Sequence, residues 1–367
     1  MSFGARALIR LGALGHNLKL LRSAAPGAKV MAVIKANAYG HGMEAVALQM
    51  NDVDSFAVAR LPEALRLRAA GVDKPIVLLA GVLSNEELAQ SVEQGFEVVV
   101  HCREQIDLLM TYRGSPATVW LKFDTGMNRL GVHPDDAPTL ISSLGSAESV
   151  AELRLMTHLA SADDQDTEFT QDQADLFRKI SDGFSGAVSI ANSPATLGIP
   201  DVANASAVFG FTGDHWIRPG IALFGISPFH GRNAAELGLK AVMQFEARLI
   251  SKKPLLAGAR VGYRGRYTSD ADSTLGIIAA GYGDGYSRHF RDGTPVLIND
   301  RRVPLIGNVS MDMIAVDLGP DAPDEVGDVA ILWGDDLPVE EVAPWADAIP
   351  YELVCGVTNR EASEIVL

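Results

Sequence analysis

The sequence predicts an α/β fold in which an N-terminal (β/α)8 barrel of the TIM type is followed by a mostly β domain. Through the first 235 residues, short apolar runs alternate with helix-like segments, and continuous apolarity is typical of parallel strands buried on both faces. Beyond residue 235 the helical periodicity fades, and β-type runs with tight turns replace it. We therefore divide the 367 residues into a barrel, 1–235, and a second domain, 236–367.

The eight expected barrel strands are short and rich in Val, Ile, Leu and Ala. They are 30–34, 56–59, 76–80, 97–100, 119–123, 153–157, 187–191 and 216–217. Between them, Ser84 to Glu87 form a capping-box pattern at a helix start, and Gly95 lies where that helix would end. An open doubly wound sheet is the structural alternative, but no glycine-rich fingerprint follows the first strand.

The second domain is predicted from five β-type runs. These are 245–251, 274–280, 295–298, 313–318 and 329–333. Asn299 and Asp300 have the composition of a hairpin turn after the third run, and Gly327-Asp328 precede the fifth.

Composition and charge exclude several classes of function. A net charge of −15 does not suit a protein that binds nucleic acid or an anionic membrane surface. The two cysteines, Cys102 and Cys355, form no CxxC pattern, so we expect neither a disulfide framework nor a metal site. Arg6 and Arg10 interrupt the apolar character of the N-terminus, and no run is long enough to span a membrane. We expect a cytoplasmic protein.

Polar residues follow five of the expected barrel strands. They are Lys35, Arg129, His158, the pair Asn192-Ser193, and Arg218. In a (β/α)8 barrel the loops after the strands form one mouth, where the functional residues lie. The five positions are therefore expected to converge there, and their positive charge suits an anionic ligand.

A lysine at the end of a buried strand should have a lowered pKa, because burial disfavours its charged form. A neutral amine is what Schiff-base chemistry requires. From position alone two other interpretations stay open: Lys35 reaches solvent along its flexible stem, and His158 is a structural histidine.

Residues 32–42, AVIKANAYGHG, resemble the motif that holds pyridoxal 5'-phosphate (PLP) in the alanine racemase family, whose barrel is of PLP fold type III. The resemblance continues through KFDTGMNRLG (122–131), TH (157–158), NS (192–193), IRPGIAL (217–223), AGYGDGY (280–286), VSMD (309–312) and PYE (350–352). The lysine and RPG motifs occur more widely among barrel PLP proteins, whereas their combination with GYGDGY and SMD is much more specific. The sequence is identified as a member of that family.

The resemblance implies that Lys35 holds PLP covalently and then acts as the base on one face of the substrate. Tyr282 from a partner subunit would act on the other face, which gives a two-base interconversion of L-alanine and D-alanine. A tyrosine with a pKa of about 10 needs stabilisation to act as a base, and the family links it to residues matching His158 and Arg218. Arg218 would also face the pyridine nitrogen and keep it unprotonated, because a guanidinium can only donate.

The same resemblance assigns the remaining binding residues. The phosphate is expected against Tyr39, Ser193, the backbone of Gly220 and Ile221, and Tyr351, since hydroxyls and an exposed backbone can bind a phosphate without bulk.

The substrate carboxylate is expected against Arg129 and the backbone of Met311, with Lys122 and Asp312 in supporting roles. In some family members the lysine that matches Lys122 is carbamylated and orients the arginine. Four side chains should crowd the pocket and favour alanine, with serine as second choice: Tyr39, Tyr282, Tyr351 and Met311.

Three alternative functions were considered, and two segments of the chain depart from the family's sequence. A serine racemase is the nearest alternative. A PLP decarboxylase of the barrel type would carry Glu-Pro-Gly where this chain has Arg218-Pro219-Gly220, and a non-catalytic PLP carrier would be a lone barrel. Segments 209–216 and 357–363 differ from the family's usual sequence. The family's architecture implies a head-to-tail homodimer in which each second domain completes its partner's site.

Overall fold

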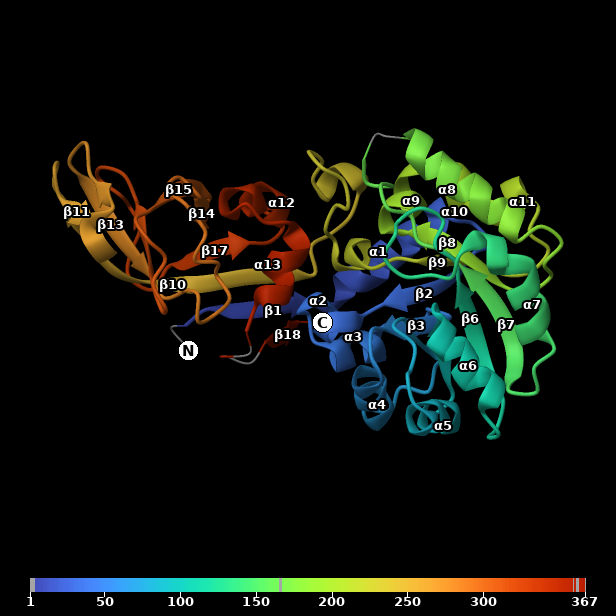
Figure 1. The fold of residues 1–367 in the computed structure, drawn as a ribbon. Coiled ribbons are helices and arrows are strands. Elements are labelled where there is room, and N and C mark those ends of the chain that lie inside the picture. The colour runs from blue at the N-terminus through green and yellow to red at the C-terminus, as the bar shows by residue number, and fades with distance from the viewer. Residues whose placement is uncertain (1–3, 165–166, 359, 361–362, 367) are drawn as a thin grey trace.

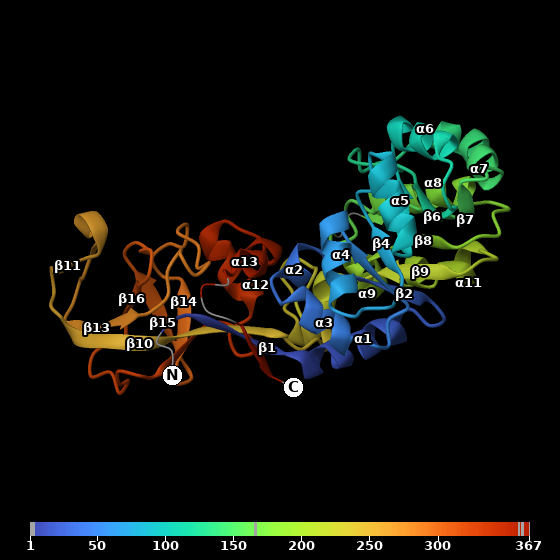
Figure 2. The same ribbon diagram turned by 90° about the horizontal axis from the view of Figure 1, so that it is seen from below.

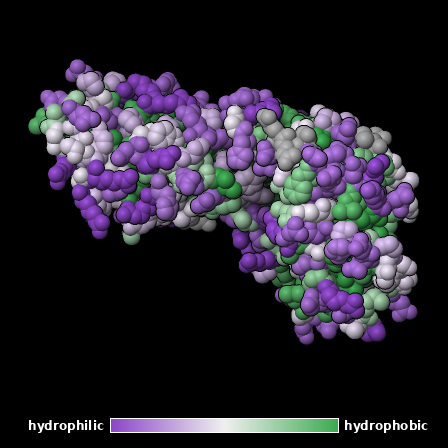
Figure 3. All heavy atoms as spheres, turned by 45° about the horizontal axis from the view of Figure 1, so that its top comes forward, coloured by the Kyte–Doolittle hydropathy of each residue, from purple (hydrophilic) through white to green (hydrophobic). Residues whose placement is uncertain are grey.

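The computed structural model describes residues 4–164, 167–358, 360 and 363–366. It has two lobes, a barrel and a sheet domain, joined where the N-terminal strand, β10 (Met243–Leu255) and α13 (Pro350–Gly356) lie together (Figure 1). The space-filling view shows these lobes as a bent, elongated molecule with a hollow on one side (Figure 3).

Eight parallel strands close into the predicted barrel. Each strand pairs with the next along the chain, and the last pairs with the first. The fold class and all eight expected strands are confirmed, and their limits shift by three residues at most. The strands are β2 (Lys29–Val33), β3 (Ser55–Val58), β4 (Ile76–Leu78), β5 (Phe96–Val100), β6 (Ala117–Lys122), β7 (Val150–Met156), β8 (Val188–Asn192) and β9 (His215–Arg218).

Helices surround this barrel. Helix α5 begins as predicted, because Ser84 Oγ accepts a hydrogen bond from the Glu87 N–H at 3.1 Å. The Glu87 carboxylate accepts from the N–H of Leu83 rather than from that of Ser84, so the second half of the expected capping box is displaced by one residue. The helices are α1 (Leu11–Ala24), α2 (Lys35–Tyr39), α3 (Met43–Gln49), α4 (Leu61–Ala69), α5 (Asn85–Glu93), α6 (Arg103–Thr111), α7 (Ala137–Gly145), α8 (Thr167–Ile180), α9 (Ser193–Gly198), α10 (Pro200–Ala203) and α11 (Ala205–Phe209).

The second domain is built around a sheet with the order β13-β16-β15-β14-β17-β10-β1-β18, in which β10 also pairs with β13. The predicted hairpin turn is confirmed, because Ile298 pairs with Arg301 while Asn299 and Asp300 both have positive φ. The strands are β10 (Met243–Leu255), β11 (Arg260–Val261), β12 (Tyr267–Thr268), β13 (Ser273–Ile278), β14 (Pro295–Ile298), β15 (Arg301–Ile306), β16 (Ile314–Asp317), β17 (Val329–Trp333) and β18 (Glu364–Val366), with helices α12 (Val339–Val342) and α13 (Pro350–Gly356).

The first strand of the chain, β1 (Arg6–Arg10), belongs to this second sheet. It pairs antiparallel with β10 and parallel with β18. Ala7 and Ile9 point into the core, while Arg6 binds Glu246 of β10 at 2.8 Å. The division at residue 235 leaves β1 on the barrel side, whereas its hydrogen bonds join it to the sheet domain.

The two lobes make close contact beside α2. A Cβ atom at Gly40 would lie 2.1 Å from the carbonyl oxygen of Val354 in α13. Only glycine allows this approach, and Gly40 also has a positive φ of 83°. The loop after β2 is therefore packed against the second domain, with α2 and α13 neighbours in both ribbon views (Figure 2).

Candidate functional site

The carboxyl ends of the barrel strands surround a cavity of about 590 Å³. The predicted strand-end residues all line it: Lys35, Arg129, His158, Asn192, Ser193 and Arg218. Further predicted residues on its wall are Lys122, Tyr39, Gly220, Ile221 and Tyr351, the last from the second domain. The expected convergence on one mouth is confirmed.

Lys35 begins a left-handed turn, which was not predicted. The next four residues, Ala36, Asn37, Ala38 and Tyr39, have φ between 53° and 55°. This conformation costs about 1–2 kcal/mol for each non-glycine residue, so the surroundings must hold the turn. The carboxylate of Glu63, from the start of α4, does so by accepting from the Ala36 N–H at 2.7 Å.

Electrostatics at the mouth favour neutral amines. Burial, followed by the charge of Arg129, lowers the pKa of Lys35, and Glu63 partly opposes this. The expected direction of the Lys35 shift is therefore confirmed. Burial and the charges of Arg218, Arg129 and Lys35 lower the pKa of Lys122 to about 8.

Arg218 is fixed at the end of β9 by a buried set of acceptors. Its guanidinium donates to Ser189 Oγ and to the carbonyls of Thr157 and Ile190, and it lies 3.4 Å from His158 Nδ1. Burial lowers the pKa of Arg218 only to about 10, so it remains a cation at neutral pH. The pKa of His158 falls well below its usual value through burial and the Arg218 charge. A neutral His158 can accept from Arg218 through Nδ1.

Hydroxyls and backbone form a compact polar cradle beside Arg218. Ser193 Oγ accepts from the N–H groups of Gly220 at 2.9 Å and Ala222 at 3.4 Å. A Cβ at Gly220 would lie 2.5 Å from the Tyr39 hydroxyl oxygen, so a side chain there would fill the cradle. Hydroxyls with an accessible backbone are a suitable setting for a phosphate.

The loop after β6 presents Arg129. Asp124 Oδ1 accepts from the N–H groups of Gly126 and Asn128, each at 3.0 Å, which folds the loop back on itself. Asn128 has a positive φ of 55°, a conformation that asparagine tolerates better than most residues. The residue before Arg129 is thus fixed by local hydrogen bonding.

Three predicted site residues lie away from this mouth. Tyr282, Met311 and Asp312 are in the second domain and do not line the cavity of their own chain. They do lie together: the N–H of Tyr282 donates to the Ser310 carbonyl at 3.0 Å, and the N–H of Gly283 donates to that of Met311 at 2.9 Å. The side chains of Tyr282 and Met311 are 41% and 52% exposed.

The described residues of the two departures from the family sequence do not line the cavity. Segment 209–216 precedes and enters β9 at the end opposite the mouth, where Phe211 packs edge-on against Phe177. In the tail, Arg360 pairs with Asp312 at 2.6 Å, while residues 359, 361 and 362 lie outside the described part of the chain.

Sequence reasoning missed Glu63 and Asp163. The available signal for Glu63 was its position three residues after the N-cap of α4, where an acidic side chain can accept from backbone N–H groups. Asp163 lines the cavity and its charge adds to burial in raising the pKa of Tyr351, but no sequence motif marks Asp163.

A barrel with a buried lysine at its mouth, paired with a second β domain, defines a class of two-domain barrel enzymes. Residues 9–228 match the family description "Alanine racemase, N-terminal domain" and residues 242–365 match "Alanine racemase, C-terminal domain". The chain therefore belongs to the alanine racemase family, whose members are PLP-dependent isomerases.

Individual relatives agree with this assignment. An alanine racemase of Vibrio cholerae is 46% identical over 97% of this chain and 96% of its own length. The crystal structure of a biosynthetic alanine racemase from Pseudomonas aeruginosa superposes with a TM-score of 0.94 at 38% identity, covering both chains fully. The alanine racemase of Acinetobacter baumannii gives 0.91 at 33% identity, again over both full chains.

None of the described helices is long and apolar enough to cross a membrane. The described part of the chain also contains no cluster of three His, Cys, Asp or Glu residues suited to a metal ion.

Proposed function

We propose that this chain interconverts L-alanine and D-alanine, with PLP bonded covalently to Lys35. One observation carries the proposal: the amine of Lys35, whose pKa is lowered, shares a cavity with the Arg218–His158 pair and the polar cradle. The family membership and the relatives named alanine racemase support it.

The residues present fit PLP. Tyr39, Ser193, Gly220 and Ile221 would hold its phosphate, because a hydroxyl and a backbone N–H already meet at Ser193 and the space is kept open by Gly220. Tyr351 lies on the same cavity wall and would be a further phosphate contact. When bound, PLP would withdraw electrons from an attached amino acid and so weaken its Cα–H bond.

Arg218 would meet the ring nitrogen of the cofactor. A carboxylate at this place would keep that nitrogen protonated, whereas a guanidinium that stays charged can only donate to it. The neutral His158 lies beside Arg218. This arrangement supports a role for these two side chains in stabilising the phenolate form of Tyr282 of the partner subunit. We infer that the arrangement favours proton exchange at Cα over side reactions that need a stronger electron sink.

Two groups would exchange the α-proton from opposite faces. The Lys35 amine would take the proton of D-alanine, and Tyr282 of the partner subunit would take that of L-alanine. Tyr282 lies outside its own chain's cavity and is substantially exposed, as are its neighbours Met311 and Met313. This supports a head-to-tail homodimer in which residues 236–367 complete the partner's site, with Met311 near the substrate and Asp312 holding that loop through Arg360.

Arg129 would bind the substrate carboxylate. Lys122 lies on the same wall, and its amine is neutral enough at mild alkaline pH to react with carbon dioxide. A carbamate on Lys122 would give Arg129 an anionic partner. Tyr39 and Tyr351 narrow the cavity, which favours alanine over serine. A cytoplasmic location stays a prediction.

The activity is tested by incubating L-alanine with protein and PLP and following both optical rotation and carbon dioxide. Loss of rotation without carbon dioxide supports racemisation. Release of carbon dioxide would identify a decarboxylase, and bound PLP without turnover would identify a carrier. Running L-serine and larger L-amino acids alongside measures substrate breadth.

Shared sites are tested by mixing a Lys35→Ala chain with a Tyr282→Phe chain, each nearly inactive alone. In a head-to-tail dimer, half of the randomly formed dimers are hybrids with one intact site each, so about a quarter of all sites are intact. Activity near that level supports the proposal. No recovery after verified subunit exchange would contradict it.

A further inference from the structure

His41 is a buried histidine in the PLP-lysine motif to which neither the site nor the proposed reaction gives a task. Its side chain is inaccessible to solvent and stacks on Phe224, with ring centroids 4.5 Å apart. Its Nδ1 lies 3.0 Å from the carbonyl oxygen of Ala38 and 2.9 Å from that of Tyr39. Both carbonyls belong to the left-handed turn that begins after Lys35.

These contacts determine which ring nitrogen carries the hydrogen. Carbonyl oxygens can only accept, so Nδ1 of His41 must donate. Burial lowers the pKa of His41 to about 4, which keeps the ring neutral. Nε2 is then a hydrogen-bond acceptor, yet it has no partner among the described residues.

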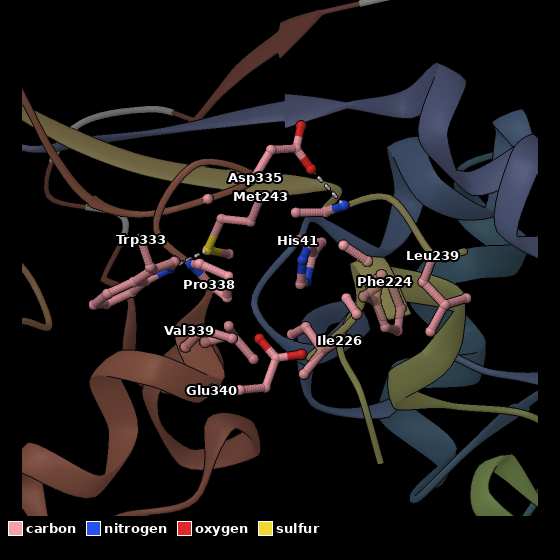
Figure 4. A pocket seen from close by; sticks show the side chains of 16 residues that line it. His41, Phe224, Ile226, Leu239, Met243, Trp333, Asp335, Pro338, Val339 and Glu340 are labelled. Carbon is pink, nitrogen blue, oxygen red and sulfur yellow. Dashed lines mark hydrogen bonds between the residues drawn. The ribbon is translucent and has the colours of Figure 1, made fainter. Parts of the chain in front are cut away.

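A second cavity lies beside His41, at the junction of the barrel and the second domain (Figure 4). It measures about 40 Å³, and its wall includes His41, Phe224 and Met243 together with Trp333 and Glu340. A cavity of at least about 10–15 Å³ can hold a water, provided that polar partners are present.

Glu340 supplies a second polar group on the wall. Its carboxylate accepts from the Ser227 N–H at 2.7 Å, which joins α12 of the second domain to the end of the barrel. Burial raises its pKa. In the close-up, Glu340 and His41 enter the same cavity from opposite lobes (Figure 4).

We propose that His41 is a positioning residue for Lys35: its Nδ1–H holds the two carbonyls of the left-handed turn, and a buried water in this cavity donates to Nε2 and secures that tautomer. The proposal rests on Lys35 being the cofactor lysine. The turn ends at Tyr39, whose hydroxyl lies against Gly220. The hydrogen bonds of the His41 ring therefore fix both the backbone next to Lys35 and the position of Tyr39, a predicted phosphate contact.

Three substitutions separate the two ring nitrogens. In His41→Asn the side-chain amide can take the place of Nδ1, in His41→Gln it takes the place of Nε2, and His41→Phe keeps the ring shape but neither nitrogen. Each PLP-loaded variant is diluted into an aldehyde trap, and cofactor loss is followed by absorbance. We expect the Gln and Phe variants to lose PLP about tenfold faster than the parent, equivalent to one buried hydrogen bond, and the Asn variant to stay within about threefold.

Thermal unfolding of the apoproteins provides the folding control. If the Phe variant does not fold, the rates of PLP loss from the Asn and Gln variants still test the role of Nδ1. Equal cofactor loss in Asn and Gln, or parent-like retention in Phe, would overturn the role of His41.

A high-resolution crystal structure of the PLP-bound enzyme tests the water directly. Ordered density within hydrogen-bond distance of Nε2 is expected, and an empty cavity or a rotated imidazole would refute it. Reductive trapping distinguishes this failure from failure of the proposed function. If the proposed function is wrong, the label is found on a peptide without Lys35; if only the His41 proposal is wrong, the label stays on Lys35.

Discussion

Replacing Gly220 by alanine should weaken PLP binding without unfolding the protein. The added Cβ would lie 2.5 Å from the hydroxyl oxygen of Tyr39 and 3.1 Å from its Cζ. Tyr39 is only 8% exposed, and its ring packs against Phe224 and Tyr351 with centroids 5.2 Å and 6.1 Å away. The ring therefore has little room, and its hydroxyl must move out of the phosphate cradle.

The expected magnitude follows from that displacement. A hydrogen bond to a charged group contributes about 1.5–3 kcal/mol, so losing one should weaken PLP binding by about 10- to 150-fold. Titrating the apoprotein with PLP and following absorbance measures the change. Gly15→Ala is the matched control, because Gly15 lies in α1 with no atom within 4 Å of its added Cβ. It should leave PLP affinity unchanged and stabilise the fold by up to about 1 kcal/mol.

A double-mutant cycle isolates the contact itself. In a Tyr39→Phe background the clashing hydroxyl is absent, so Gly220→Ala should cost much less affinity than it does alone. Additive effects of the two substitutions, or parent-like affinity in Gly220→Ala, would show that the hydroxyl and the cradle do not act together.

Three further predictions concern the chemical groups. Lys35→Ala should abolish borohydride-dependent labelling of the chain by PLP, and a label retained on another peptide would contradict its assignment. Tyr282→Phe should impair α-proton exchange from L-alanine more than from D-alanine; equal losses would count against two opposed bases. Because the pKa of Lys122 is lowered to about 8, its neutral fraction rises as pH increases from 7 to 9. The fraction of chains that carry a carbon dioxide adduct on Lys122 should increase in parallel, and an unmodified amine at pH 9 under carbon dioxide would exclude the carbamate.

The barrel could be predicted from sequence because buried parallel strands have a distinctive composition. A run such as 30–34 is apolar throughout, and the residue after each run falls at a known place in the fold. Strand β1 escaped prediction for the opposite reason. Its five residues alternate in burial, with arginine at both ends, and its partners are β10 and β18, far along the chain. Residues 7–9 are all apolar, so the letters themselves do not show this alternation.

Most of the polar residues on the cavity wall could be predicted from sequence, but the local geometry could not. Motif resemblance identified Lys35, whereas nothing in the letters KANAY indicates four successive residues with positive φ. Alanine and tyrosine have no intrinsic preference for that conformation. It is imposed by groups from elsewhere, including the Glu63 carboxylate and the His41 ring. Sequence patterns report local conformational preference and burial. A backbone conformation that is imposed by residues distant in the sequence therefore cannot be predicted from them.

The clustering of positive charge at the barrel mouth relates the geometry of the site to ligand binding. The chain has a net charge of −15, yet its barrel mouth gathers Lys35, Lys122, Arg129 and Arg218 around one cavity. After burial, the charge of Arg129 lowers the pKa of Lys35, and the charges of Arg218, Arg129 and Lys35 lower that of Lys122, which is an unfavourable arrangement until an anion enters. A phosphate and a substrate carboxylate would supply that negative charge. The folded barrel thus bears local repulsion that ligand binding relieves, and ligand affinity and amine reactivity then have the same electrostatic origin.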